Sequence, residues 1–416
     1  MIFSLLKYYL LWTLLSGLIG LLSGTASAGF LFSLDLVTQL REAHPWLLFL
    51  LPLGGALVGS LYYYFGKDVD AGSNLIIDEF HDAKAIIPIR MTPLVLIGTL
   101  LTHLFGGSAG REGTAVQMGA SIADQFTKIF KLESRDRRTL LMAGMAGGFG
   151  SVFGVPFAGT LFGLEVLSVG KLHLWAIFEC AVAAFIAHQT TLAWGIHHTA
   201  YPIPEIPAFA FTNIFYALLA GIAFGLAARL FALSVDAIKS FSKKLVPRLV
   251  VRAIFGGVLL SAIYYFTPET IRYSGLGVPL IVSSLKISLP YYDWIMKLIM
   301  TAITLGTGFR GGEVTPLLFI GSTLGNTLGQ ILPLAIPVLA SIGLVGVFAG
   351  AANTPFACIV MAMELFGPGI FIYAAIACFT AYVVSGHRGI YHSQRVHQPK
   401  KYLVNHSFEM KQNKDS

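Results

Sequence analysis

Long apolar segments recur along the chain, separated by short polar connections. A helix that crosses a bilayer needs about 20 predominantly apolar residues. The clearest runs of this kind cover residues 9–34, 46–65, 211–235, 249–266 and 369–386. They predict an all-α, polytopic membrane protein that is embedded in a lipid bilayer.

Other apolar segments are short and are interrupted by glycine or proline. One is 72-GSNLII-77, and two further runs break at Gly106-Gly107 and at Gly311-Gly312. Broken helices are tolerated at membrane depth only where the backbone is buried in protein or lines a cavity. Their N-termini offer free N–H groups and the positive end of the helix dipole, which together suit an anion. With ordinary and broken helices combined, we expect about fifteen to eighteen helices or half-helices.

Composition agrees with this pattern and narrows the functions. The 416 residues are 55% hydrophobic and only 12% charged, with a mean hydropathy of +0.73, whereas soluble domains carry roughly twice that charged fraction. The net charge of +7 concentrates in 239-KSFSKKLVPR-248 and 387-HRGIYHSQRVHQPKK-401, and the positive-inside bias places such clusters in the cytoplasm. No soluble domain is present to bind nucleic acid, so we expect no nucleic-acid partner.

Residues that could hold a metal or form a disulfide are not suitably spaced. Cys180, Cys358 and Cys378 all lie in apolar runs without CxxC spacing, and the eleven histidines show no metal-binding pattern. We expect these cysteines to be small buried apolar residues, and we expect no metal and no cofactor. An intramembrane enzyme, the alternative from another functional class, would need a nucleophile–base or metal constellation, and none is visible.

Two blocks of sequence recur in the same order. The segment 147-GGFGSVFGVPFAGTLFGLEVL-167 matches 346-GVFAGAANTPFACIVMAMELF-366 at an offset of 199 residues, and 110-GREGTAVQMGAS-121 matches 311-GGEVTPLLFIGST-323 at 201. Duplicated membrane units are typical of secondary transporters, whose repeats enclose a site near the bilayer midplane. The alternative is that helices rich in small residues resemble one another because close packing favours such residues.

The repetition divides the chain into parts. We predict a first membrane repeat over residues 1–205, a second over 206–395, and a short polar tail over 396–416. The sequence leaves open whether the repeats run parallel or inverted.

The stretch 106-GGSAGREGTAVQMGAS-121 places Arg111 and Glu112 among glycines in an apolar setting. Glycines let the backbone approach a ligand closely. A carboxylate at a helix N-terminus is stabilised by the dipole and can occupy the position of an anion. On taking up a proton it can release that position, so one side chain can serve as gate and proton carrier. Ionisable groups inside a membrane are functional by default; the alternative is a surface loop with an Arg–Glu pair.

These motifs resemble those of the CLC family of chloride channels and anion/proton antiporters. GREG at 110–113 is similar to the family's glutamate-gate motif, with Glu112 on the gating glutamate, and 311-GGEVTPLLFIG-321 is similar to its third anion-site motif. Segment 147–167 resembles its packed helix pair, and Tyr391 falls where the family places an anion-coordinating tyrosine. The resemblance covers about residues 10–395, and the ordered combination of motifs is specific although no single motif is.

The departures from the usual motifs are informative. GSGIP becomes GSNLI at 72–76, GREGP becomes GREGT through Thr114, and GxFxP becomes GEVTP, which introduces Val314 and Thr315. Val166 stands where the antiporters have an internal proton-relay glutamate. Together these changes resemble the fluoride-exporting branch of the family.

The resemblance therefore implies a fluoride/proton antiporter that uses the proton gradient to export fluoride. It also implies inverted repeats, a homodimer with one pathway in each subunit, and a cell membrane location of the bacterial plasma- or inner-membrane type. The alternative is a chloride/proton antiporter or a passive chloride channel of the same fold.

A small, strongly hydrated anion such as fluoride requires strong donors at close range in a dehydrated site. Hydroxyls, an amide and helix-start N–H groups are available. Besides the gate Glu112, the expected anion-binding residues are Ser73, Asn74, Gly110, Arg111, Gly113, Thr114, Val314, Thr315 and Tyr391.

Other polar residues have a structural explanation as well as a functional one. We expect Glu165 and Glu364, which the repeat relates, to cap helices or pair within the bundle. Glu313 matches Glu112 at the offset of 201 and is either a second ionisable site or a helix-start residue. Ser108 is interpreted as a helix-start hydroxyl.

Overall fold

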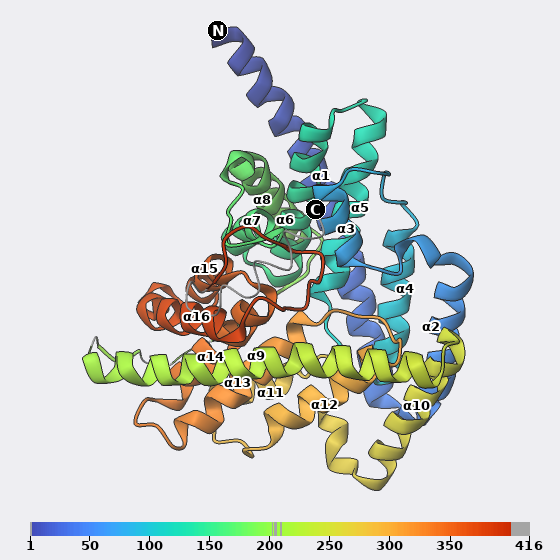
Figure 1. Ribbon diagram of the computed structural model, residues 1–416, viewed down its shortest axis with the longest axis vertical. Coiled ribbons are helices and arrows are strands. Elements are labelled where there is room, and N and C mark those ends of the chain that lie inside the picture. Colours follow the sequence, from blue (N-terminus) through green and yellow to red (C-terminus); the bar gives the residue numbers. More distant parts are fainter. Residues whose placement is uncertain (1, 202, 204–205, 209, 401–416) are drawn as a thin grey trace, which may run out of the picture.

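A computed structural model describes residues 2–201, 203, 206–208 and 210–400, with side chains from residue 6 onward. Within these residues the chain forms sixteen α-helices, five short 3₁₀ helices and two strands of two residues each. The all-α class and the number of helices agree with the prediction. Figure 1 shows the helices coloured along the chain.

The helices come in two series of eight. The first is α1 (Ile2–Ala43), α2 (Leu51–Phe65), α3 (Ser73–His81), α4 (Met91–Leu104), α5 (Glu112–Ile129), α6 (Ser134–Phe153), α7 (Pro156–Glu165) and α8 (Ile177–Ala193). The second is α9 (Phe211–Leu245), α10 (Leu249–Phe266), α11 (Val278–Ser284), α12 (Asp293–Gly306), α13 (Val314–Gly329), α14 (Ile336–Ala352), α15 (Pro355–Phe366) and α16 (Phe371–Ser385). The remaining elements are η1 (Pro45–Leu50), η2 (Lys67–Val69), η3 (Leu174–Ala176), η4 (Pro268–Tyr273), η5 (Pro368–Ile370), β1 (Ser168–Val169) and β2 (Arg395–Val396).

Six helical stretches of the described chain are long and apolar enough to cross a membrane by length and composition. Five of them contain the predicted apolar runs, and the sixth covers Leu174–Ala193. The chain is therefore a multi-pass membrane protein. Helix α9 continues to Leu245, so Lys239, Lys243 and Lys244 of the first basic cluster lie on the last turns of a long helix. In Figure 1 this helix crosses the whole width of the molecule.

The core is built around helices α6 and α14. Almost every residue of α6 from Thr139 to Phe153, and of α14 from Val338 to Ala352, is buried. A helix that is apolar on all sides is stable only where protein surrounds it. Glycines on α5 and α13 face glycines of α6 and α14 so closely that a Cβ would collide with backbone, as at Gly119 against Gly144. Small residues thus bring these helices into backbone contact.

Helices α7 and α15 cap each other through their glutamates. The carboxylate of Glu165 at the end of α7 accepts hydrogen bonds from the N–H groups of Phe356 and Ala357 at the start of α15, at 3.0 and 2.8 Å. The carboxylate of Glu364 on α15 accepts from Phe157 and Ala158 at the start of α7, at 3.0 and 2.7 Å. Both glutamates satisfy orphan helix-start donors, so the structural interpretation of this pair is confirmed.

The reciprocal contacts continue at the glycine-rich breaks. Gly110 and Gly312 form an isolated antiparallel bridge. In a two-fold arrangement each bridging residue pairs with its own equivalent, which gives an offset of 202, the same as the offset between the first residues of α5 and α13. The ungapped match at 201 is therefore wrong by one residue, because glycines on either side match equally well in two registers. The division into residues 1–205 and 206–395 stays a prediction, which these contacts support.

The chain after α16 returns to the first series of helices. Strand β2 pairs in parallel with β1, and the Gln394 side chain donates hydrogen bonds to the carbonyls of Val166 and Ala352 at 2.6 and 2.9 Å. This anchoring holds Tyr391 against the helix bundle, where it is buried. Most of the predicted tail, residues 401–416, lies outside the described residues.

Candidate anion pathway

The two glycine-rich breaks meet inside the molecule. The Gly110 N–H donates to the Gly312 carbonyl at 2.6 Å, and the Gly312 N–H donates to the Gly110 carbonyl at 2.8 Å. A Cβ on Gly110 would lie 2.9 Å from the Gly312 oxygen and 3.0 Å from the Thr315 nitrogen. Only glycine permits this approach, and it brings the N-termini of α5 and α13 together.

The Glu112 carboxylate lies at the N-terminus of α13. It accepts a hydrogen bond from the Thr315 N–H at 2.9 Å, and the Thr315 hydroxyl lies 2.6 Å from both carboxylate oxygens. The Arg111 N–H also donates to it, at 3.2 Å. The side chain is completely buried. Hydrogen bonds to an ionised acceptor are the stronger kind, and the start of α13 adds its positive dipole end. We call this position the Glu112 seat.

Arg111 is the N-cap residue of α5. Its Nε lies 3.6 Å from the nearer Glu112 oxygen, which is an ion pair without a hydrogen bond. The side chain makes no hydrogen bond to any residue in the described part of the chain. The structure therefore shows a loose ion pair between Arg111 and Glu112, its neighbour in the chain.

Two cavities approach the Glu112 seat from different sides. Cavity 1, of about 160 Å³, is lined by Gly113, Gly312 and Val314 among others. Cavity 2, of about 630 Å³, is lined by Arg111 together with residues of α1, η4 and α11. Arg111 and Gly113 flank Glu112 in the chain and line different cavities, so the backbone at Glu112 separates the two.

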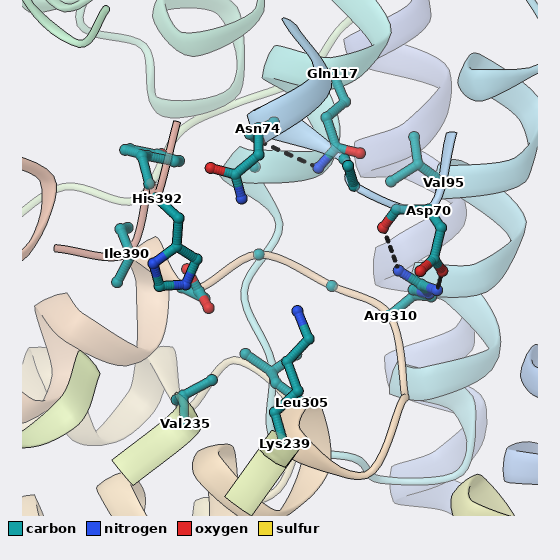
Figure 2. Close-up of a pocket in the computed structure, with 18 of the residues that line it drawn as sticks. Asp70, Asn74, Val95, Gln117, Val235, Lys239, Leu305, Arg310, Ile390 and His392 are labelled. Carbon is teal, nitrogen blue, oxygen red and sulfur yellow. Dashed lines mark hydrogen bonds and ion pairs between the residues drawn. The ribbon is translucent and has the colours of Figure 1, made fainter. Parts of the chain in front are cut away.

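Cavity 1 collects residues that are far apart in the sequence. Five of the nine residues for which the sequence predicts anion binding line it, namely Ser73, Asn74, Gly113, Val314 and Tyr391. Figure 2 shows the amide nitrogen of Asn74 directed into the open space.

Asn74 and Ser73 also have partners in the protein. The Asn74 carbonyl oxygen accepts a hydrogen bond from the Ser393 N–H at 3.0 Å, and Gln117 donates to the Ser73 hydroxyl at 3.3 Å. Asn74 therefore links α3 to the segment that carries Tyr391 while its N–H₂ group stays directed into the cavity.

Three polar residues of the breaks do not take part in the Glu112 seat. The Thr114 hydroxyl lies 2.8 Å from the Thr99 hydroxyl of α4, not at the Glu112 seat. The Ser108 hydroxyl lies 2.9 Å from the Thr301 hydroxyl of α12. Glu313 lines cavity 1 beside Val314 and does not contact Glu112. The role of Thr114 in anion binding thus lacks a contact, although its backbone belongs to the start of α5.

Sequence reasoning missed several charged residues of cavity 1. Figure 2 shows the Lys239 ammonium projecting into the cavity from α9. His392 forms an ion pair with Asp236 at 3.0 Å when protonated, and Arg310 is paired with Asp70. Lys239 begins the basic cluster that the sequence assigns to the cytoplasm, and that cluster was the available signal.

Comparisons with known proteins agree with this geometry. The family model described as voltage gated chloride channel matches residues 54–386. A chloride/fluoride channel protein of Pseudomonas syringae pv. tomato is 52% identical over 402 residues, covering 95% of this chain and 89% of that protein.

Two solved structures have the same fold. A CLC-type fluoride/proton antiporter matches with a TM-score of 0.89 and 36% identity, covering 92% of this chain and 98% of that one. A slow cyanobacterial Cl⁻/H⁺ antiporter matches with a TM-score of 0.79 and 20% identity over 91% and 96%, which shows the fold alone. The chain belongs to the CLC family of voltage gated chloride channels.

Proposed function

We propose that this protein is a fluoride/proton antiporter that exports fluoride from the cell by means of the proton gradient, with Glu112 as gate and proton carrier. The observation that carries the proposal is the Glu112 seat: a buried carboxylate held at the start of α13, where the backbone at Glu112 separates two cavities. The sequence identity of 52% with the chloride/fluoride channel protein and of 36% with the fluoride/proton antiporter supports fluoride as the substrate.

The exchange follows from the chemistry of the seat. While ionised, the carboxylate takes the donors that an anion would use, namely the N–H and hydroxyl of Thr315. Protonation removes the charge that these donors and the dipole of α13 stabilise. The neutral carboxyl then leaves the seat, and a fluoride ion replaces it on the same donors. Fluoride and the ionised carboxylate thus compete for one position, and protonation of Glu112 decides which of them occupies it.

The donor set favours a strongly hydrated anion. The Thr315 hydroxyl and the Asn74 amide are additional to the usual chloride motifs, and both are directed to the pathway. Val166, which replaces the relay glutamate, is fully buried at the end of α7. A proton therefore has no carboxylate relay at that position, and we propose that it travels on Glu112 along the path of the anion.

The basic residues assign the orientation. Cavity 1 is lined by Lys239 and by residues 390–392 of the second basic cluster. Because cytoplasmic connections carry the excess of Lys and Arg, cavity 1 opens to the cytoplasm and cavity 2 to the outside. The family resemblance further supports a homodimer with one pathway in each subunit.

The test is fluoride efflux from proteoliposomes, recorded with a fluoride electrode and an internal pH dye. Wild-type protein should release fluoride and drive protons inward, and Glu112→Gln should abolish the proton movement. Asp35→Asn is the matched control, since this carboxylate lines cavity 2 and does not contact Glu112; it should keep the coupling. Chloride efflux as fast as fluoride efflux would favour the chloride antiporter or channel, and proton coupling retained in Glu112→Gln would refute the gate.

A further inference from the structure

Cavity 2 has properties that fluoride transport does not require. Its volume of about 630 Å³ is many times the roughly 30 Å³ that one water molecule occupies in the liquid, and a fluoride ion is similar in size to a water molecule. The lining carries three arginines, Arg41, Arg111 and Arg272. A space of this size and charge suits an anion larger than fluoride.

Two of these arginines have unused binding capacity. Arg41 is only 7% exposed. Its Nη1 donates to the His103 carbonyl at 3.0 Å, and its Nη2 lies 3.6 Å from a carboxylate oxygen of the exposed Glu42. The Arg111 side chain makes no hydrogen bond to the described residues, and its buried Nε faces the Glu112 carboxylate at 3.6 Å without a hydrogen bond. A buried donor without a partner costs free energy that a ligand can recover.

Glu112 offsets the charge of Arg111 through the ion pair at 3.6 Å, but the acidic groups of the cavity lining do not neutralise Arg41. Asp293, which is fully buried, is engaged by Arg272 and accepts a hydrogen bond from the Tyr273 hydroxyl at 2.6 Å. Asp35 and Glu42 are exposed to solvent, and Asp35 accepts a hydrogen bond from Gln39 at 2.6 Å. Charges exposed to water are screened, whereas buried charges are not. The inner wall of cavity 2 is therefore positive and its outer rim carries the acids.

We propose that Arg41 and Arg111 form a second anion-binding site in cavity 2, separate from the Glu112 seat, which takes a small oxyanion such as sulfate or phosphate and, when occupied, inhibits transport. The planar guanidinium group presents paired N–H donors that match two oxygens of one oxyanion, and this match favours an oxyanion over a spherical ion. Inhibition follows from position, because Arg111 adjoins Glu112 and an anion bound to it obstructs the cavity through which the substrate must pass.

The first test measures binding without transport, so it does not depend on the proposed function. Sulfate is titrated calorimetrically into the purified full-length protein at constant ionic strength. Wild-type protein should bind one sulfate per chain saturably, and Arg41→Gln should weaken the affinity by at least about tenfold, since it removes a charged, two-pronged donor. Thr38→Asp, which adds a negative charge to the cavity without removing the bond from Arg41 to His103, should weaken it as well. Asp35→Asn should leave the affinity unchanged or increase it.

The second test measures inhibition and rests on the proposed function. Sulfate added outside proteoliposomes should slow fluoride efflux by the wild type, and Arg41→Gln and Thr38→Asp should relieve this inhibition. The proposal is overturned if the wild type binds no sulfate saturably, if both variants bind it as tightly as the wild type, or if bound sulfate leaves efflux unchanged. Absent fluoride transport with intact sulfate binding would instead reject the proposed function and the inhibition, and would leave the site itself standing.

Discussion

The starts of α5 and α13 have equivalent backbone positions, but the side chains at these positions differ in charge. In the register of the Gly110–Gly312 bridge, Arg111 corresponds to Glu313 and Glu112 corresponds to Val314. Arg111 lines cavity 2, whereas Glu313 lines cavity 1. The shared frame supplies two helix N-termini, and only one of them carries a carboxylate that reaches across to the other.

This difference explains how a nearly symmetric frame can hold a single buried carboxylate at the paired helix starts. Val314 is buried and apolar, so it neither competes with Glu112 for the donors of Thr315 nor repels it. A second carboxylate at this position would place two like charges in one buried site, which disfavours the ionised form of one of them. Because Glu112 is a carboxylate and the equivalent Val314 is apolar, only one carboxylate occupies the seat.

The largest expected effect comes from the donor that α13 alone provides. Thr315→Val removes a hydroxyl hydrogen bond to a charged group, worth about 1.5–3 kcal/mol, so the equilibrium constant for occupying the Glu112 seat should fall roughly 10- to 100-fold. The number of protons moved per fluoride should decrease, as measured in proteoliposomes. Thr315→Ser keeps the hydroxyl and should restore the coupling; wild-type coupling in the valine variant would show that the hydroxyl does not hold the gate.

The second effect tests the bridge that both helix starts share. Gly110→Ala would force a Cβ against the backbone at Gly312 and Thr315, and overpacking of this kind costs about 1–3 kcal/mol. Thermal unfolding of the detergent-solubilised protein should show a lowered Tm. Gly29→Ala on α1 is the matched control, because a Cβ there meets nothing within 4 Å, and alanine is the better helix former. Equal Tm values for the two variants would refute the close contact.

A third effect compares the reciprocal caps of α7 and α15. Glu165 is 4% exposed and Glu364 is half-buried. Glutamine leaves one carbonyl oxygen for two backbone N–H donors, so the loss should be larger at Glu165, about 1–3 kcal/mol in Glu165→Gln. It should be smaller at Glu364, where water can replace the missing acceptor. The two Tm values measure the difference. A larger loss in Glu364→Gln would contradict the ranking by burial.

The smallest effect concerns a residue of α5 that corresponds to Pro316 in α13. Thr114→Val removes the hydroxyl contact with Thr99, which keeps its own hydrogen bond to the Val95 carbonyl. The expected loss of stability is about 0.5 kcal/mol, at the low end for a neutral hydrogen bond. Fluoride efflux should stay within about twofold of the wild type, and a strong loss of efflux would return Thr114 to the anion-binding residues.

The membrane spans and the breaks were predictable because each depends on local sequence. Bilayer thickness dictates the length of an apolar run, and the glycines at 106–107 and 311–312 interrupt α4–α5 and α12–α13 as expected. The capping by Glu165 and Glu364 also followed from residue type and repeat position. The register in which residues 110–121 match residues 311–323 was not predictable, since neighbouring glycines made two alignments nearly equivalent.

The sequence by itself determined a multi-pass helical protein, a pair of glycine-rich helix starts and a carboxylate in one of them, because hydropathy, chain flexibility and charge are properties of short segments. Only the tertiary structure decided that Glu112 binds Thr315, 203 positions further along the chain, that Thr114 turns to α4, and that Lys239 and Arg41 line opposite cavities. The physical reason is that these contacts depend on how distant helices cross. The packing of the helices decides in which direction a side chain points and which cavity it enters, and no local sequence pattern encodes this.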